Sequence, residues 1–262
     1  LALRDAIDRA FETFASQRPG PVHIDLPTSF ITQECNAPPF TIIKPQQEIE
    51  IEAELLQGAC AALNSSLAPL IIAGGGSMRA SVELLELAEK LGSPIVATIN
   101  ARGWFPSEHP LLVPASPSLK SVREFLERSD CVLAVGTELG PTDFDMDNLG
   151  LMPTIEQLIR IDIDADQASR NMDGQIKIVA PAELVLEQLL PGIDCKEAKG
   201  TTGQQRAEAA RKESYAELLG EINDIEEVRA IKVPMYLLRS KSRPIGPNTK
   251  RLWNYLKSLE LS

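Results

Sequence analysis

Between residues 46 and 194, short segments rich in apolar residues alternate with longer segments of helical periodicity. The apolar segments span residues 70–73, 94–98, 131–135, 160–163 and 176–179, and the helical segments span 51–64, 80–91, 119–128 and 182–190. Strands that are apolar on both faces and separated by amphipathic helices are typical of a parallel sheet with helices on both sides. This alternation therefore predicts a doubly wound α/β domain with about six parallel strands.

The flanking stretches follow other patterns. Residues 1–14 have helical periodicity, and residues 22–26 read as one strand that Pro27 ends. One helix and one strand cannot bury their apolar faces by themselves, so they need a sheet to join. We predict four parts: the end of a preceding domain over 1–29, a linker over 30–46, the central α/β domain over 47–194, and a linker with a further helix over 195–262.

Charge and composition argue against several classes of protein. The 262 residues include 26 Lys and Arg against 37 Asp and Glu, and the net charge of −11 repels nucleic acids and anionic membrane surfaces. No apolar run approaches the ~20 residues that a membrane helix needs, and the charges within residues 1–14 argue against a signal peptide. We therefore expect a cytoplasmic protein whose partners are neither nucleic acids nor membranes.

Cysteine and histidine residues offer no metal site. The chain has four cysteines, which stand far apart: Cys35, Cys60, Cys131 and Cys195. Because they form no Cys-x-x-Cys pair, neither a zinc site nor a disulfide framework is expected. The two histidines have no partner at metal-ligand spacing, so we expect no metal bound by this chain.

A glycine triplet is the first candidate for a binding site. Gly74, Gly75 and Gly76 follow the apolar segment 70–73, where glycines let backbone N–H groups approach a phosphate at a helix N-terminus. Arg79 stands where the dinucleotide fingerprint needs its third glycine. A tight turn without a ligand, in which Gly75 adopts a positive φ, is the alternative interpretation.

Two acidic residues, Asp162 and Asp164, bracket the end of the apolar segment 160–163. An acidic side chain at the carboxyl end of a parallel strand can hold a ribose hydroxyl or an adenine amine. In the alternative interpretation Asp164 caps the next helix and Asp162 faces solvent. Both interpretations stay open.

Two loops carry further reactive residue types. Residues 98–111 are long for a connection in an α/β domain and contain Arg102 and His109, although a lone histidine beside a proline favours a structural hydrogen bond. Asp143 and Asp145 have no base or nucleophile near them in the sequence, which favours a solvated acidic loop. We therefore assign no catalytic residue.

Seven segments of the chain match one family in the family's own order. They are residues 11–15, 18–27, 73–76, 92–98, 103–111, 130–136 and 161–164, including Arg18-Pro19-Gly20-Pro21 and Gly103-x-Phe105-Pro106-x-x-His109-Pro110-Leu111. Together they resemble the thiamine diphosphate enzymes, which include acetolactate synthase and benzoylformate decarboxylase. The matches span residues 4–190, most of the chain.

The resemblance implies a fold, an activity and a set of cofactors. Residues 1–29 would end the pyrimidine-binding domain, 47–194 would be the six-stranded central domain, and 195–262 would lead towards the diphosphate-binding domain. The parent protein would be a lyase or transferase that uses thiamine diphosphate and magnesium to decarboxylate or condense a small 2-oxo acid. Family members of this kind are usually homodimers or homotetramers.

In this family the activating glutamate lies upstream of the position of Leu1, and the Gly-Asp-Gly…Asn-Asn segment that holds magnesium lies downstream of Ser262. The chain alone is therefore expected neither to bind thiamine diphosphate nor to be active.

The resemblance also bears on the branch of the family. Acetolactate synthases hold FAD with an Arg-Phe-Asp-Asp-Arg stretch, and residues 137–143 here read Thr-Glu-Leu-Gly-Pro-Thr-Asp, so FAD is not expected and ADP stays open. This stretch looks like a 2-oxo acid decarboxylase, and we expect a basic substrate such as 5-guanidino-2-oxopentanoate. Two other functions stay open, a free-standing adenine-nucleotide-binding module and a non-catalytic assembly subunit.

Overall fold

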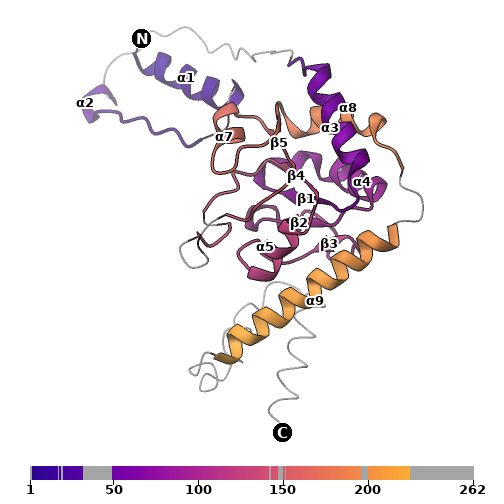
Figure 1. Cartoon of the computed structure of the whole chain (residues 1–262). Coiled ribbons are helices and arrows are strands. Elements are labelled where there is room, and N and C mark those ends of the chain that lie inside the picture. The colour runs from indigo at the N-terminus through magenta and orange to yellow at the C-terminus, as the bar shows by residue number, and fades with distance from the viewer. Residues whose placement is uncertain are drawn as a thin grey trace. The chain divides into compact units, whose positions relative to one another are not determined.

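The strands form in the apolar segments because most of them are buried on both faces of one sheet. The computed structural model describes residues 2–16, 18, 20–31, 49–141, 143–146, 150, 152–195 and 200–224 (Figure 1). The strands are β1 (Pro69–Ala73), β2 (Ile95–Ala97), β3 (Leu112–Val113), β4 (Cys131–Val135), β5 (Leu158–Asp162) and β6 (Ile176–Val179). All neighbours pair in parallel, in the order β3-β2-β1-β4-β5-β6, which confirms the predicted fold class.

Helices precede, connect and follow these strands. They are α1 (Ala2–Ser16), α2 (Thr28–Ile31), α3 (Ala53–Ser65), α4 (Ser81–Leu91), α5 (Lys120–Glu127), α7 (Ala165–Ser169), α8 (Ala182–Leu189) and α9 (Gly200–Asp224), with short 3₁₀ turns η1 (Gly75–Ala80), η2 (Ile99–Ala101) and η3 (Leu190–Gly192). The chain divides into two compact units, Leu1–Glu217 and Leu218–Ser262, and every contact described below lies within the first.

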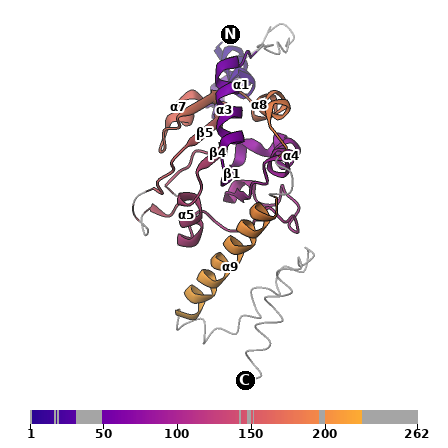
Figure 2. The same ribbon diagram turned by 45° about the vertical axis from the view of Figure 1, so that its right-hand side comes forward.

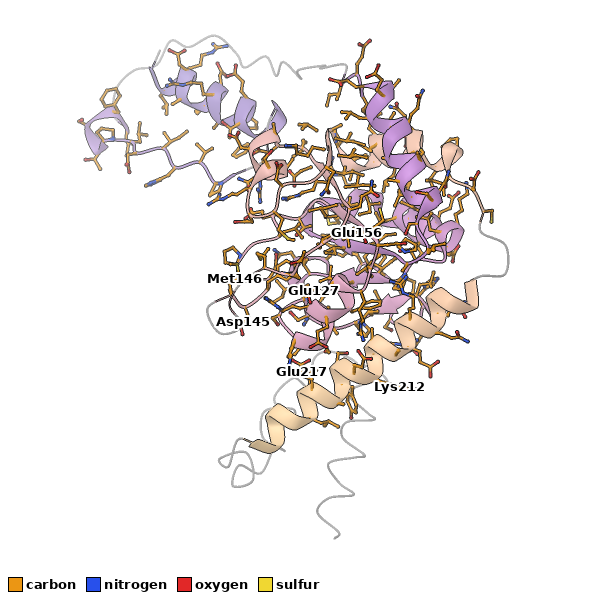
Figure 3. All side chains as sticks on the ribbon, viewed as in Figure 1. Glu127, Asp145, Met146, Glu156, Lys212 and Glu217 are labelled. Atoms are coloured by element: carbon orange, nitrogen blue, oxygen red, sulfur yellow. The ribbon has the colours of Figure 1, made fainter. Side chains whose placement is uncertain are left out.

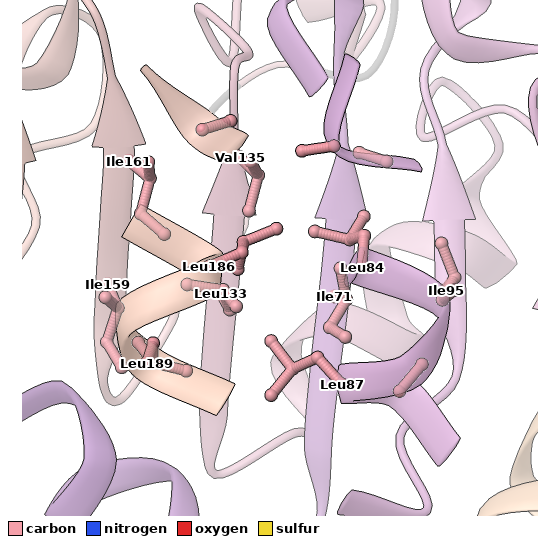
Figure 4. Close-up of a cluster of buried hydrophobic side chains, with 14 of the residues drawn as sticks. Ile71, Leu84, Leu87, Ile95, Leu133, Val135, Ile159, Ile161, Leu186 and Leu189 are labelled. Atoms are coloured by element: carbon pink, nitrogen blue, oxygen red, sulfur yellow. The ribbon is translucent and has the colours of Figure 1, made fainter. Parts of the chain in front are cut away.

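One face of the sheet is covered by α3, α4 and α8. Figure 4 shows Leu84 and Leu87 of α4 and Leu186 and Leu189 of α8 above the strands, close to Leu133 of β4. All five side chains are fully buried. Burial of each leucine stabilises the fold by about 1.5–3 kcal/mol, so this layer supplies much of the core.

Residues of α5, α9 and the loop that follows β4 pack against the other face. Figure 2 shows α5 on the opposite side of the domain from α4. The residues of α9 that turn towards the sheet are small, namely Gly203, Ala207, Ala210 and Ser214, and all four are buried. Their spacing of four, three and four residues places them on one side of a helix. Because they are small, the backbone of α9 lies close to the α/β layers.

Polar contacts anchor α9 along the same side. Arg206 donates to the carbonyl oxygen of Pro69 at 2.8 Å and stacks over the ring of Phe125. The carboxylate of Glu217 (Figure 3) accepts from the backbone N–H groups of Lys120 and Ser121, at 2.7 and 2.8 Å, and so caps α5. Residues 203–217 thus contact the α/β unit although they lie outside the predicted central domain, 47–194, and the four-part division stays a prediction.

The amino-terminal stretch differs from its prediction in one respect. Residues 2–16 form the expected helix, in which Phe11 and Phe14 make an edge-to-face contact. Residues 22–26 pair with no strand in the part of the chain that the structure describes, and their apolar side chains are exposed. A lone strand has no backbone partner, which explains the difference. Most of the linker at 30–46, and residues 225–262 of the predicted carboxyl-terminal part, lie outside the described residues.

Candidate functional site

The candidate residues lie at the carboxyl edge of the sheet, where β1 and β4 are neighbours. From β1 the chain proceeds to β2 on one side, and from β4 it proceeds to β5 on the other, so this is the topological switch point of the fold. Ligands of open α/β sheets bind at such points. The glycine triplet follows β1, whereas Asp162 ends β5, one strand beyond β4.

The glycine triplet packs backbone against backbone with the loop after β4. A Cβ atom at Gly74 would overlap the carbonyl oxygen of Gly136 and the side chain of Thr137, and one at Gly76 would lie 2.9 Å from the Cα atom of Gly136. Gly136 itself has a φ of 57°. Three glycines are therefore needed for two loops to meet at this closeness, whether or not a ligand binds.

Gly75 is placed differently from its two neighbours. It is exposed, and a Cβ atom there would lie 3.4 Å from the Cβ atom of Asn100, an ordinary distance. Its φ is not in the positive range, so the expectation that Gly75 needs a left-handed backbone is wrong. The turn tightens into the 3₁₀ conformation of η1 instead, and the positive φ falls on Gly136 in the facing loop.

The amide groups that could hold a phosphate are partly used by the protein. The N–H of Gly76 donates to the carbonyl oxygen of Gly136 at 2.8 Å, and the N–H of Ser77 donates to that of Gly74 at 3.1 Å. The buried hydroxyl of Ser77 donates to the same Gly74 oxygen at 2.8 Å. An anion at this turn would compete with these hydrogen bonds.

The two candidate aspartates also have partners in the chain. Asp164 caps α7 by accepting from the N–H groups of Asp166 and Gln167, as one of the two interpretations predicts. Asp162 accepts from the N–H of Asp164 at 3.1 Å and is only 8% exposed, so the expectation that it faces solvent is wrong. Burial raises the pKa of the Asp162 carboxyl, although the charges of Arg18 and Arg160 act in the opposite direction.

Arg160, in the middle of β5, organises this edge and was not recognised from the sequence. Its side chain is 1% exposed and donates to the carbonyl oxygens of Thr137, Arg170 and Met172 at 2.7–2.8 Å. Burial lowers the pKa of its guanidinium. A charged residue inside an otherwise apolar strand is the signal that could have identified it, because buried charges need dedicated partners.

Three consecutive carbonyl groups of the loop after β4 are held by three different elements. Gly136 accepts from the N–H of Gly76, Thr137 accepts from Arg160, and Glu138 accepts from the side-chain amide of Asn171 at 2.9 Å. The path of the backbone at the switch point is therefore fixed.

The rest of this loop is anchored by buried apolar side chains. Leu139 and Phe144 are fully buried. The backbone is left-handed at Leu139, with a φ of 48°, and at Asp145 (Figure 3), with a φ of 47°. Burial raises the pKa of Asp143. The negative charge of Glu138 raises this pKa further, whereas a hydrogen bond from Gly140 lowers it. Asp143 is therefore not simply a solvated acid, as the sequence had indicated.

The long loop after β2 holds its histidine in a structural role. His109 lies 3.1 Å from a carboxylate oxygen of Glu89 through Nε2, and its Nδ1 accepts from the N–H of Leu111 at 3.3 Å. Both ring nitrogens are thus engaged, in agreement with the interpretation that the sequence favoured. Arg102, in the same loop, is exposed.

The amino-terminal stretch contacts the loop that follows β4. Arg18 forms an ion pair with Glu138. Its charge also favours the ionised form of Asp162. Arg18 therefore interacts electrostatically with two carboxylates at this edge, those of Glu138 and Asp162.

Among the described residues, no group of three or more His, Cys, Asp or Glu side chains could hold a metal ion. No helix within this part of the chain is long and apolar enough to cross a membrane.

Comparison with known proteins places the fold in a family. Residues 56–189 match the model of the thiamine pyrophosphate enzyme central domain. A solved structure described as a thiamin diphosphate-dependent enzyme from Mycobacterium smegmatis superposes with a TM-score of 0.50 and 24% identity, covering 61% of this chain and 31% of that one. This second likeness is one of fold.

Relatives in the same family differ in activity. The chain is 32% identical to a "probable 2-ketoarginine decarboxylase" of Pseudomonas aeruginosa over 72% of its length and 33% of the relative's. It is 30% identical to a "probable acetolactate synthase large subunit" of Methanocaldococcus jannaschii (91% and 38%), and 31% identical to 2-hydroxyacyl-CoA lyase 1 of Dictyostelium discoideum (71% and 33%). The chain thus spans about a third of the length of the relatives it matches.

Proposed function

Since the chain belongs to the thiamine pyrophosphate enzymes and carries their central domain, we propose that it is the scaffold domain of a thiamine diphosphate-dependent 2-oxo acid decarboxylase. The observation that carries this proposal is the match of residues 56–189, which extends from α3 to the end of α8 and includes every strand of the sheet. The parent protein would use thiamine diphosphate and magnesium, held by residues other than those described, to release carbon dioxide from a 2-oxo acid.

Within that parent, the role of this domain is structural. The side chains at its carboxyl edge are engaged with the protein itself, as Arg160 and Asp164 illustrate. A rigid edge of this kind provides fixed surfaces for neighbouring domains. The parent would be a cytoplasmic homodimer or homotetramer.

For the substrate we propose a 2-oxo acid with a basic side chain, of the type of 5-guanidino-2-oxopentanoate. Two observations support it: residues 137–143 lack the arginines of FAD-binding relatives, and a relative named for 2-ketoarginine matches at 32% identity. Decarboxylation, rather than condensation, is the reaction that this likeness favours.

The test is an assay of the native protein that contains this chain. With thiamine diphosphate and magnesium it should release carbon dioxide from 5-guanidino-2-oxopentanoate faster than from pyruvate, and the rate should fall when the cofactor is removed. Formation of acetolactate from pyruvate would favour the carboligase instead. Absence of decarboxylation with a panel of basic, aromatic and aliphatic 2-oxo acids would overturn the proposal.

We further propose that the carboxyl edge is a vestigial nucleotide site. The N–H of Gly76 and the carboxylate of Asp164 already have partners, and Asp162 is buried, so little remains to hold a diphosphate or a ribose. Calorimetric titration of the chain with ADP, FAD and NAD should show no binding at micromolar concentrations. Micromolar affinity for ADP would support a nucleotide-binding module.

A further inference from the structure

The turn between α7 and β6 contains the only Asp-Gly sequence of the chain, Asp173-Gly174. The chain has no Asn-Gly sequence. An aspartyl residue followed by glycine can close a five-membered ring on its own main chain, because glycine has no side chain that would hinder the approach. Whether this ring forms in the folded protein depends on how the two residues are held.

The residues on both sides of this pair are anchored to β5. Before the pair, the carbonyl oxygen of Met172 accepts from Arg160 at 2.7 Å. After it, the side chain of Gln175 accepts from the N–H of Leu158 at 2.7 Å. The turn therefore has a fixed position beside β5.

The main chain of the pair itself is not anchored in this way. Neither Asp173 nor Gly174 makes a main-chain hydrogen bond with the residues that the structure describes. Gly174 is buried, and the main-chain N–H groups of buried residues nearly always have an acceptor. The amide nitrogen of Gly174 is therefore available to the neighbouring carboxyl group of Asp173.

The carboxyl group of Asp173 is exposed and has one ion pair. Its side chain is 70% exposed and lies 2.8 Å from Nζ of Lys177, which also donates to the hydroxyl of Ser169 at 3.2 Å. Water therefore reaches the carboxyl group. The ion pair restrains the side chain, so ring closure requires that Asp173 leave Lys177. Exposed ion pairs contribute little free energy, and the carboxyl group can leave.

Packing around Arg160 keeps a glycine at position 174. A Cβ atom there would lie 2.9 Å from Cγ of Arg160 and 3.0 Å from the carbonyl oxygen of Leu158. Arg160 is 1% exposed, and it cannot move away without breaking its own hydrogen bonds. The reactive sequence is thus tied to the buried arginine.

We propose that Asp173 is a site of spontaneous covalent modification, at which the folded chain forms isoaspartate. The nitrogen of Gly174 attacks Cγ of the protonated carboxyl group, so that a C–N bond forms, a C–O bond breaks, and one water molecule leaves with the amide proton. Water then adds to either carbonyl carbon of the imide ring. Opening at the original main-chain carbonyl leaves the chain running through Cγ, which is isoaspartate. These steps need no oxidant, reductant or cofactor, and the inference does not depend on the reaction proposed above.

Isoaspartate lengthens the main chain by one methylene group between Met172 and Gly174. Met172 accepts from Arg160, and Gly174 packs against the same side chain, so a longer main chain displaces one of these contacts. The modified chain should melt roughly 2–8 °C lower than the fresh chain, the shift expected when a buried arginine loses one hydrogen bond.

The test is incubation of the folded 262-residue chain in heavy-oxygen water at physiological temperature, followed by peptide mass spectrometry. Isoaspartate should accumulate at position 173, with one heavy oxygen atom for each ring opening. It should not accumulate at Asp166, which is exposed but is followed by Gln167. A synthetic peptide of residues 170–177 gives the rate without the fold. If position 173 of the folded chain stays unmodified in the time that the peptide needs to convert, the fold keeps the two groups apart and the proposal is overturned.

Two variants separate the chemistry from the packing, and circular dichroism checks that both fold. Asp173→Glu retains the charge opposite Lys177 but would need a six-membered ring, so it should keep its melting temperature during the incubation. Lys177→Met releases the carboxyl group and should raise the rate of conversion several-fold. A parent that keeps its melting temperature as well as Asp173→Glu does would contradict the effect on Arg160. Equal rates in the parent and in Lys177→Met would overturn the restraint by the ion pair.

Discussion

Gly203 of α9 lies directly against Gly92, the residue that ends α4, so that a Cβ atom on Gly203 would overlap the carbonyl oxygen of Gly92. Gly92 has a φ of 61° and caps α4 through hydrogen bonds to Ala88 and Glu89. A glycine inside a helix costs about 1 kcal/mol relative to alanine. The contact with Gly92 explains why a glycine occupies position 203 of α9, and it shows that α9 packs against the α/β unit.

Gly203→Ala should therefore destabilise the protein although alanine favours helices. We expect a loss of about 1–2 kcal/mol in the free energy of unfolding, because overpacking costs about 1–3 kcal/mol and helix propensity returns part of it. Urea denaturation followed by circular dichroism measures the change. Gly220→Ala in the same helix, where the added Cβ would meet no other described segment within 4 Å, is the control and should be neutral or slightly stabilising. Equal effects at both positions would contradict the seating of α9.

Gly74→Ala should destabilise the switch point, and Gly75→Ala should not. The first substitution forces a methyl group into Gly136 and Thr137, at a cost of about 1–3 kcal/mol, whereas the second meets only an ordinary contact with Asn100. Thermal melting of the two variants compares them. A Gly74→Ala protein as stable as the parent would mean that the two loops are further apart than described.

Arg160→Met should lower the free energy of unfolding by about 3 kcal/mol, because one buried and two partly buried carbonyl groups lose their donor, at about 1–3 kcal/mol for each group that water cannot reach. Hydrogen exchange should rise at residues 137–139 and 170–172, which the guanidinium joins. Arg170→Met is the control, since Arg170 is exposed and contributes its backbone carbonyl. A small, equal effect of both substitutions would show that the loops hold without the buried arginine.

Glu217→Gln should remove part of the acid sensitivity of the fold. Burial alone would raise the pKa of Glu217, but hydrogen bonds from Ser121 and Lys120 outweigh it and hold the pKa below 4.5, the value expected when unfolded. A carboxyl group with a lowered pKa in the folded state stabilises the fold above its unfolded value, and the stabilisation is lost as pH falls through the folded value. The parent should be more stable than the variant at pH 7, and the two should converge below pH 4.5 in urea denaturation at a series of pH values. A difference that is independent of pH would remove Glu217 from this role.

Thiamine diphosphate and magnesium should not raise the melting temperature of the 262-residue chain. A ligand that binds only the folded state stabilises it by RT ln(1 + [L]/Kd), and the described residues include no group of three or more His, Cys, Asp or Glu side chains that could hold the metal. Differential scanning fluorimetry over a range of cofactor concentrations checks this. A saturable rise would contradict the assignment of the cofactor to residues other than those described.

Sequence patterns predicted the sheet well because its strands are buried on both faces. Five of six strands, including β1 and β4, coincide with apolar segments, and helices α3, α4 and α8 with amphipathic ones. β3 could not be predicted, since two residues carry no period, and residues 22–26 show that a strand-like pattern is not sufficient without a neighbour.

The site was predicted in location and less well in detail. The sequence indicated Gly74–Gly76, Asp162 and Asp164, and all lie at the carboxyl edge. It could not show that Gly74 and Gly76 meet Gly136, because contacts between distant segments leave no local pattern. Arg160 could have been recognised as a charge inside an apolar strand, but its three acceptors could not, because they are backbone atoms that any residue supplies.

That choice of acceptors affects how the edge can evolve. Because Arg160 donates to the main-chain oxygens of Thr137, Arg170 and Met172, the side chains of those three residues are not needed for these hydrogen bonds. Selection can therefore replace the residues of both loops while the course of the chain is preserved, and new surface chemistry can arise without loss of the frame. The buried arginine makes this edge a place where related enzymes can diverge, and a suitable one for grafting a designed specificity.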